Sequence, residues 1–157
     1  MREELVRTAK EIIEKILYIT IATVCEDGKP WNTPVYAAYD EQYTFYWSSS
    51  PEAEHSKNVV RNGQAFLVIY DFTQAEGAGV GVYIQARAAE LREESEIANA
   101  LKYFYGRKHK AIKPVSDFIG TSPRRMYKAV PEQVWINTYE KLNEYPIDQR
   151  VEIKLVA

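Results

Sequence analysis

The 157-residue chain has little cysteine and histidine, the residues that most often form disulfides and metal sites. Its one cysteine, Cys25, cannot form a disulfide within the chain, and the neighbouring Thr23 and Val24 are typical of an ordinary strand. Its two histidines, His55 and His109, are too far apart in sequence to show the spacing of metal ligands. We therefore expect no internal disulfide and no metal site.

The chain also lacks long apolar runs and an excess of either charge. No apolar run approaches the ~20 residues that cross a bilayer, and the N-terminal region does not have the pattern of a secretion signal. With 20 Lys and Arg against 22 Asp and Glu, the net charge is −2, so no global positive field exists to hold a nucleic acid or an anionic membrane. We expect a soluble, cytoplasmic protein with neither partner.

One local run offers an alternative on nucleic acid. The segment "KYFYGRKHK", residues 102–110, combines aromatic and basic side chains, which can stack on and attract a single strand. Its aromatic residues fall on a predicted helix, where packing in a core or a dimer is the commoner use. We keep the prediction that the chain binds no nucleic acid.

What is present supports one domain spanning residues 1–157, because 46% of the chain is hydrophobic and can form a real core. Apolar residues recur at helical spacing through residues 1–17 and again through residues 94–108, where Gly106 lies near the expected end. These patterns predict an N-terminal helix and a peripheral helix, both covering a core.

The remaining periodic segments have the β-branched content or the alternation of strands. The apolar segment 64–71 is expected to be buried on both faces, and Pro131 is expected to divide segment 124–141 into two strands. Short turns between antiparallel neighbours favour a mainly β (α+β) fold, a six- to seven-stranded antiparallel barrel with peripheral helices, over a doubly wound parallel sheet. The other strand segments are 18–25, 31–40, 43–47, 79–92 and 150–155.

The stretch "FYWSSSPEAEHSKNVVRNG", residues 45–63, is a candidate phosphate site. A helix N-terminus exposes free N–H groups, and Ser56, Lys57 and Asn58 add a hydroxyl, a charge and an amide. The alternative is structural: Ser50 before Pro51 is an ordinary helix cap, Lys57 is solvated, and a histidine beside a cap usually makes a local hydrogen bond.

The order of motifs along the chain resembles the pyridoxamine 5'-phosphate oxidase-like, FMN-binding split-barrel family over roughly residues 12–140. Each motif is short, and it is their ordered succession that carries the resemblance. The matching motifs are Ile21-Ala22-Thr23, Asp27-Gly28-Lys29-Pro30, Thr33-Pro34-Val35, Trp47-Ser48-Ser49 and His55-Ser56-Lys57-Asn58.

The resemblance implies an FMN site shared between the two copies of a homodimer. The second strand would lie along the flavin, the end of the next strand would line the ring edge, and the following segment would bind the 5'-phosphate. Trp135, on the opposite face from Val134 and Ile136, is the candidate to cover the ring from the other copy. The implied cofactor-binding residues are Asn32, Thr33, Pro34, Val35, Trp47, Ser48, Ser49, Ser50, His55, Ser56, Lys57, Asn58 and Trp135.

Two departures from the family pattern limit what the resemblance implies. The oxidase that names the family recognises pyridoxal phosphate partly through a C-terminal Arg-x-His motif, whereas residues 146–157 contain no histidine. The second strand of that oxidase carries an arginine and a lysine for the phosphate, and residues 31–39 have neither. Lys57 and a remote arginine would then supply the charge.

The resulting functional hypothesis is an FMN-dependent oxidoreductase acting on an unidentified small molecule. No paired carboxylates, no Ser-His-Asp order and no activated cysteine stand out, so we name no catalytic residue. The alternatives are a non-catalytic flavin carrier or sensor, a deazaflavin- or haem-binding relative, and a barrel without a flavin site.

Overall fold

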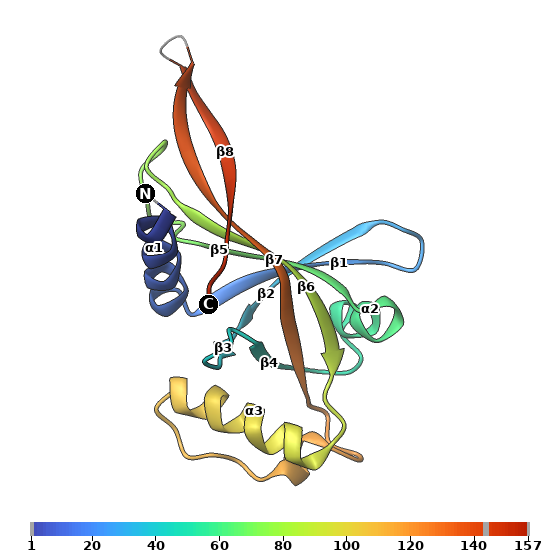
Figure 1. The fold of residues 1–157 in the computed structure, drawn as a ribbon. Coiled ribbons are helices and arrows are strands. Elements are labelled where there is room, and N and C mark those ends of the chain that lie inside the picture. The colour runs from blue at the N-terminus through green and yellow to red at the C-terminus, as the bar shows by residue number, and fades with distance from the viewer. Residues whose placement is uncertain (1, 143–144, 157) are drawn as a thin grey trace.

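The computed structural model describes residues 2–142 and 145–156, with side chains described outside 139–148. Figure 1 shows one strongly curled sheet with helices around it. The elements in chain order are α1 (Arg2–Lys15), β1 (Tyr18–Val24), β2 (Pro30–Tyr36), β3 (Ala38–Tyr39), β4 (Phe45–Ser49), α2 (Glu54–Asn62), β5 (Gln64–Tyr70), β6 (Gly81–Glu90), α3 (Glu94–Arg107), the 3-10 helix η1 (Val115–Phe118), β7 (Arg125–Leu142) and β8 (Tyr145–Ile153).

The strand order closes the sheet into a barrel. The order is β2-β1-β5-β6-β7-β4-β3, with β8 beside β7 and every pairing antiparallel. β2 and β3 lie at opposite ends of this order, yet only Ala37 separates them in the chain. The sheet must therefore curl until its two edges meet. This confirms the antiparallel split-barrel class. The structure has eight strands where six to seven were predicted, and the predicted strand 31–40 is divided at Ala37 into β2 and β3.

The barrel is not fully hydrogen-bonded. β3 pairs with β4 only at Ala38 with Tyr46 and Tyr39 with Phe45. Beyond these pairs, no described residue of β2 pairs with β4, so the rest of both edges is unpaired. We call the seam between β2 and the segment Trp47–Ser49 of β4 the split.

Alternating side chains fill the barrel, as the period of the strands predicts. β6 directs Val82, Ile84 and Ala86 inward, where all three are fully buried, whereas Gln85 and Arg87 are exposed on the other face. The interior is lined in the same way by β1 and β5.

Two strand predictions are wrong in detail. β5 is buried on one face only, because the outward Phe66 and Val68 lie on an uncovered apolar sheet surface in this chain. Pro131 does not break β7, which runs as one strand of 18 residues. Opposite it, Gln85 pairs with Gln133 and Ala86 with Pro131, so a bulge leaves one residue unpaired and absorbs a proline that has no N–H to donate.

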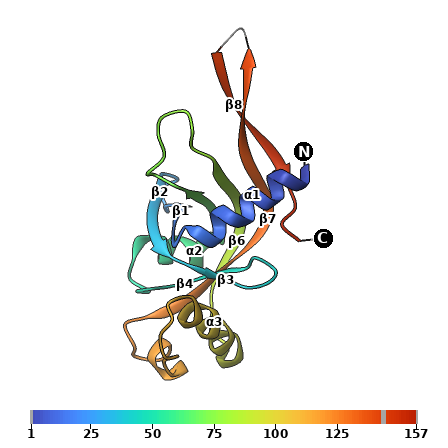
Figure 2. The ribbon, with the colours of Figure 1, turned by 90° about the vertical axis from the view of Figure 1, so that its left-hand side faces the viewer.

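Three helices cover parts of the barrel (Figure 2). α1 buries Ala9 and Ile13 against the barrel, and α3 packs Ile97, Leu101 and Phe104 into a second core on the outer side of β3 and β4. Both match the predicted helical segments closely. No helix in the described part of the chain has the length and apolarity to cross a membrane.

Arg107 fastens three parts of the fold together. Its guanidinium donates hydrogen bonds to the carbonyl of Ala37, at 3.1 Å, and to those of Ile13, Glu14 and Ile16, at 2.9, 2.9 and 3.1 Å. It thereby joins the end of α3 to the end of α1 and to the joint between β2 and β3. The planar shape of the guanidinium allows this, since it carries five donors in fixed directions.

We expect Arg107→Ala to lower the free energy of unfolding by about 2–4 kcal/mol, because hydrogen bonds from a charged donor to four carbonyls are lost. Urea denaturation measures this change. Arg107→Lys should restore only part of it, since an ammonium cannot reach all four acceptors. Arg92→Ala is the matched control, because Arg92 is exposed and pairs only with Glu90. A loss for Arg107→Ala no larger than for this control would contradict the clamp.

Candidate functional site

The split brings together the three segments predicted to bind the cofactor. Residues 32–35 lie on β2, residues 47–50 lie at the end of β4, and residues 55–58 lie in the first turns of α2. β2 contacts β4, and α2 contacts β2 and β1. Eleven of the thirteen predicted residues are therefore on elements that border the split, and Ser50 directly follows β4.

The loop before α2 is organised differently from the predicted cap. The Ser50 hydroxyl accepts a hydrogen bond from the N–H of Glu52 at 3.2 Å, which stabilises a turn rather than a helix end. The helix begins at Glu54, and Ala53 at its N-cap makes no side-chain hydrogen bond to it. The first N–H groups of α2 are thus left without a side-chain cap.

The side chains of Asn58 and Arg61 are hydrogen-bonded to other groups of the protein. Asn58 is buried and donates to the Thr23 hydroxyl at 3.0 Å, while its carbonyl accepts from Arg61 at 2.7 Å. Arg61 also donates to the carbonyl of Val24 at 2.5 Å. These bonds fix α2 to the end of β1. The role of Asn58 shown here is to position the helix.

His55 joins α2 to β4. Its ring is 8% exposed, and Nε2 lies 2.8 Å from the Ser49 hydroxyl. Burial lowers the pKa of His55, so the ring is neutral at pH 7. The pair holds the last residues of β4 against the start of the helix, and the local hydrogen bond expected for a histidine in this position is present.

Lys57 has a different environment on the same helix. Its side chain is 52% exposed, and its ammonium lies 3.2 Å from the carboxylate of Glu52. Exposed ion pairs of this kind contribute little stability, about 0–1 kcal/mol. An incoming phosphate can therefore replace Glu52 at small cost.

Three elements that border the split each carry a buried polar atom without a partner. In the part of the chain whose side chains are described, three buried side-chain atoms make no hydrogen bond: Tyr36 Oη, Trp47 Nε1 and Ser56 Oγ. They belong to β2, β4 and α2 but do not share a face, since Trp47 packs on Tyr127 in the barrel interior and Tyr36 packs on Phe104 in the second core outside it. Ser56 lies beside the Tyr127 phenol, whose pKa burial raises and this hydroxyl partly lowers, without a hydrogen bond forming between them.

Unpaired buried polar atoms are uncommon because each costs about 1–3 kcal/mol. Trp47 Nε1 and Ser56 Oγ, which both lie beside Tyr127, are the two atoms that one ligand edge would satisfy. These two atoms fit a planar group with a polar edge, such as the flavin that the family resemblance implies.

The segment of β2 at the split has two faces. Asn32 and Pro34 are exposed and point outward, while Thr33 and Val35 point into the barrel, the first half-buried and the second buried. On its free edge this segment also presents backbone groups without a ladder partner. The strand can offer hydrogen bonds through its backbone although it carries no basic side chain.

Trp135 is the predicted residue that the fold places elsewhere. It lies half-buried on the outer face of β7, stacked on Phe66 with 6.3 Å between ring centres. Tyr83 is its direct partner on β6, and the guanidinium of Arg150 lies 3.8 Å from the Tyr83 ring centre. Within one chain Trp135 does not face the split.

The sequence analysis did not identify Tyr36 or Arg61 as part of this region. Arg61 has a recognisable signal, since it follows Asn58 by one helical turn and so shares its face. Tyr36 has none, because it is one of 12 tyrosines and only packing shows that its hydroxyl is buried without a partner.

An antiparallel barrel left open along one seam defines a split-barrel protein. Comparison with known families makes this specific, since the family model of pyridoxamine 5'-phosphate oxidase matches residues 5–137. The chain belongs to the pyridoxamine 5'-phosphate oxidase family. No curated protein matches it in sequence.

Solved structures share the fold at low sequence identity. HutZ, the heme storage protein from Vibrio cholerae, has a TM-score of 0.70 and 22% identity, covering 85% of this chain and 94% of HutZ. A FAD binding protein from Mycobacterium smegmatis has a TM-score of 0.62 and 12% identity, covering 83% and 91%. A heme binding protein from Mycobacterium smegmatis has a TM-score of 0.69 and 18% identity, covering 97% of this chain but 58% of that one.

The neutral His55 generates a pH prediction. Because its pKa is lowered in the folded protein, stability is complete above the unfolded value of about 6.5 and is lost as the pH falls below it. We expect wild type to lose more unfolding free energy between about pH 7.5 and pH 5.5 than His55→Gln, up to the one-proton limit of about 1.4 kcal/mol per pH unit. Urea denaturation at both pH values tests this, with His109→Gln as an exposed control. Equal losses in wild type and His55→Gln would refute it.

Proposed function

We propose that the chain binds FMN at the split and acts as an FMN-dependent oxidoreductase on a small molecule. The observation that carries the proposal is the pair of unpaired buried polar atoms Trp47 Nε1 and Ser56 Oγ, which lie on β4 and α2 beside Tyr127. The family membership of the chain supports it.

Different residues around the split would contact the ring and the phosphate of FMN. Trp47 and the free edge of β2 offer a donor and backbone groups to the edge of a planar ring, while the inward Val35 offers an apolar surface. The uncapped N-terminus of α2, with Ser56 and Lys57, offers N–H groups, a hydroxyl and a positive charge to a phosphate. When bound, a flavin supplies the electron-transfer chemistry, and the protein orients it and limits access of water.

A haem at the split is the main alternative, since two of the structural relatives are described as heme proteins. The histidine bordering the split is His55, and its Nε2 is already 2.8 Å from the Ser49 hydroxyl. Ligation of iron by this nitrogen would require that hydrogen bond to break. The unpaired polar atoms favour a ligand whose edge carries donors and acceptors, as a flavin edge does.

The first test is an absorption spectrum of the freshly purified protein, with mass identification of anything released on denaturation. Flavin bands and the mass of FMN are the expected result. A Soret band, or the mass of a deazaflavin, would replace FMN by that cofactor. A colourless protein that also fails to bind added FMN would refute the proposal.

Lys57→Ala should weaken FMN binding about tenfold, because a charge-assisted hydrogen bond to the phosphate is lost. Fluorescence titration of apoprotein with FMN measures the change. Lys10→Ala, which removes a lysine from the exposed side of α1, is the control and should bind FMN as wild type does. Unchanged affinity in Lys57→Ala would remove Lys57 from the phosphate site.

We further propose that the site is completed by a second copy of the chain. The outer face of β1, β5 and β6 carries half-buried apolar side chains and a hollow of about 300 Å³ lined in part by Ala22, Phe66 and Gln85. Phe66 and Trp135 stack on this face. Burying it against a second copy would remove apolar surface from water, and Trp135 would then face the partner.

Trp135→Glu should convert a dimer to a monomer, because a carboxylate in an apolar interface loses its hydration without a partner. Light scattering on a size-exclusion column measures the mass. Glu132→Gln, an exposed change on the same strand, should leave the dimer intact. A wild-type monomer with bound flavin would contradict the shared site.

A further inference from the structure

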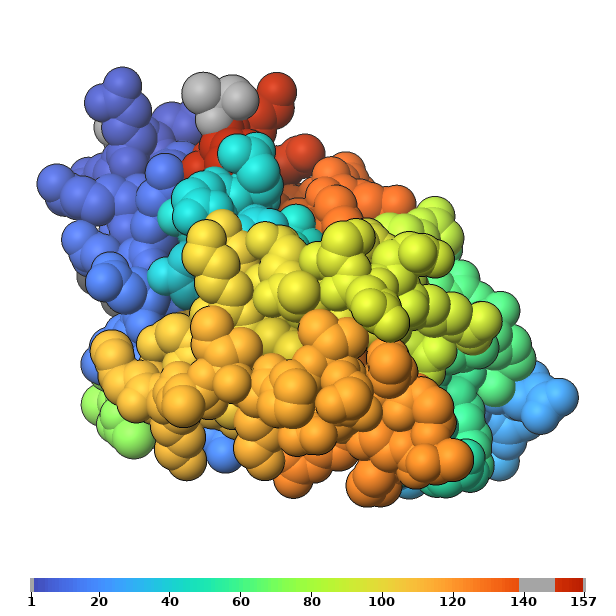
Figure 3. Space-filling view, turned by 90° about the horizontal axis from the view of Figure 1, so that it is seen from below, coloured from blue at the N-terminus to red at the C-terminus, as the bar shows by residue number. Residues whose placement is uncertain are grey.

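The connection between α3 and β7 carries a concentration of positive charge that the proposed cofactor site does not use. Residues 106–125 contain six Lys or Arg and a single acidic residue, Asp117, in a chain whose net charge is −2. Seen from below, α3 and this connection form much of the molecular surface (Figure 3).

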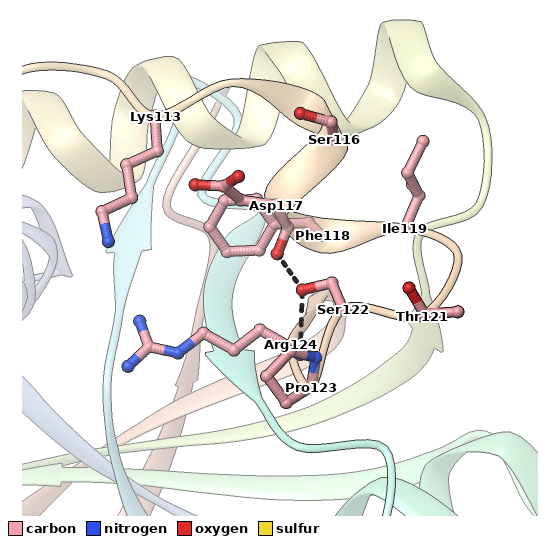
Figure 4. Close-up of a pocket in the computed structure, with 9 residues that line it drawn as sticks. All are labelled: Lys113, Ser116, Asp117, Phe118, Ile119, Thr121, Ser122, Pro123 and Arg124. Carbon is pink, nitrogen blue, oxygen red and sulfur yellow. Dashed lines mark hydrogen bonds between the residues drawn. The ribbon is translucent and has the colours of Figure 1, made fainter.

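A hollow of about 390 Å³ lies in this connection. Its volume is in the range of small-molecule sites, roughly 300–1,000 Å³. In Figure 4 the amine of Lys113 and the guanidinium of Arg124 extend to the same side of it. The hydroxyl residues Ser116, Thr121 and Ser122 line the rest, with Asp117 as the one carboxylate.

The cations around the hollow have no acidic partners. Among the residues that the structure describes, Lys108, Lys110, Lys113 and Arg124 make no ion pair. Burial lowers the pKa of Lys108, and the charges of Lys110, Arg124 and Lys113 lower it further. Lys108 itself is held by aromatic rings, 3.9 Å from the centre of Phe104.

The loop that forms the hollow is held in place by packing and by hydrogen bonds. Phe118 is buried in the core beneath α3 and anchors η1. Arg125 donates hydrogen bonds to the carbonyls of Gly120, Ser122 and Arg124, at 2.5, 2.6 and 2.7 Å. Because the loop is already ordered, little conformational entropy is lost when a ligand binds.

The connection that forms the hollow is fixed at its two ends to strands that border the split. Arg125 begins β7 and pairs with Ser49, which belongs to the predicted cofactor segment of β4. At the other end, the ammonium of Lys108 is 4.8 Å from the ring centre of Tyr36, the last residue of β2. The connection therefore contacts both strands of the split, although neither Arg125 nor Lys108 lines the hollow.

We propose that this hollow, with Lys113 and Arg124 as its charged ligands, binds the phosphate or pyrophosphate group of a small molecule distinct from the cofactor. Two cations without partners attract the anion, and the hydroxyls of Ser116 and Thr121 donate to its remaining oxygens, whereas the Ser122 hydroxyl already donates to the Asp117 carbonyl. The site stands on its own geometry. That the ligand is a co-substrate of the flavin reaction rests on the proposed function.

The test is isothermal titration with inorganic pyrophosphate at low ionic strength, where surface electrostatics are least screened. Wild type should bind pyrophosphate saturably, and the double variant Lys113→Ala/Arg124→Ala should bind it at least about tenfold more weakly. The matched control is Arg7→Ala/Lys10→Ala, which removes the same charge from the exposed side of α1 and should bind as wild type. Circular dichroism checks that each variant is folded.

Two further measurements test whether the hollow itself binds pyrophosphate and whether FMN affects that binding. Thr121→Glu places a carboxylate at the hollow without removing a cation and should also weaken binding at least tenfold. Saturation with FMN should leave pyrophosphate affinity unchanged; if FMN binds nowhere, the proposed function fails while this site is still measured.

Three outcomes would overturn the proposal. Wild type could show no saturable binding, or both double variants could lose affinity equally, which would mean attraction by net charge alone. In the third outcome FMN competes with pyrophosphate, and the hollow is then the seat of the cofactor's own phosphate.

Discussion

The short link at Ala37 is the constraint on which the fold and the candidate site depend. It leaves β2 and β3 consecutive in the chain but at opposite ends of the strand order. A sheet with that order cannot remain open and flat, so it curls into a barrel. Because β3 pairs for only two residues, closure is incomplete, and the remaining edges of β2 and β4 form the split. Arg107 fixes this joint by binding the Ala37 carbonyl together with the end of α1.

The region around the split separates polar groups that hold the structure from polar groups that remain available. Asn58 donates a hydrogen bond to the Thr23 hydroxyl on β1, and Arg61 donates one to the carbonyl of Val24 on the same strand. Trp47, Ser56 and Tyr36 are buried without partners. An unpaired buried polar atom costs stability, so the proximity of Trp47 and Ser56 to one another at Tyr127 is a physical reason to propose a ligand there.

Positively charged side chains are distributed unevenly over the molecule. β2 carries no basic residue, and α2 offers Lys57 in a weak ion pair with Glu52. The cations Lys108, Lys110, Lys113 and Arg124, which make no ion pair among the described residues, lie in the connection between α3 and β7, where Asp117 is the one acidic residue. The net charge of the chain does not reveal this local excess of positive charge. The two positively charged regions would suit the phosphate of a cofactor and a second, phosphorylated molecule.

The sequence by itself determined the helices, the alternation of the strands, the barrel class and the motifs that now border the split, because these depend on local periodicity and short turns. It did not determine that Pro131 would lie at a bulge or that Asn58 would donate a hydrogen bond to Thr23. It also did not determine that the Tyr36 hydroxyl would be buried without a hydrogen-bond partner. Nor did it bring Lys113 and Arg124 to one hollow. Only the tertiary structure decided these, because register, burial and hydrogen-bond saturation depend on residues that are distant in the chain and meet only when the barrel closes.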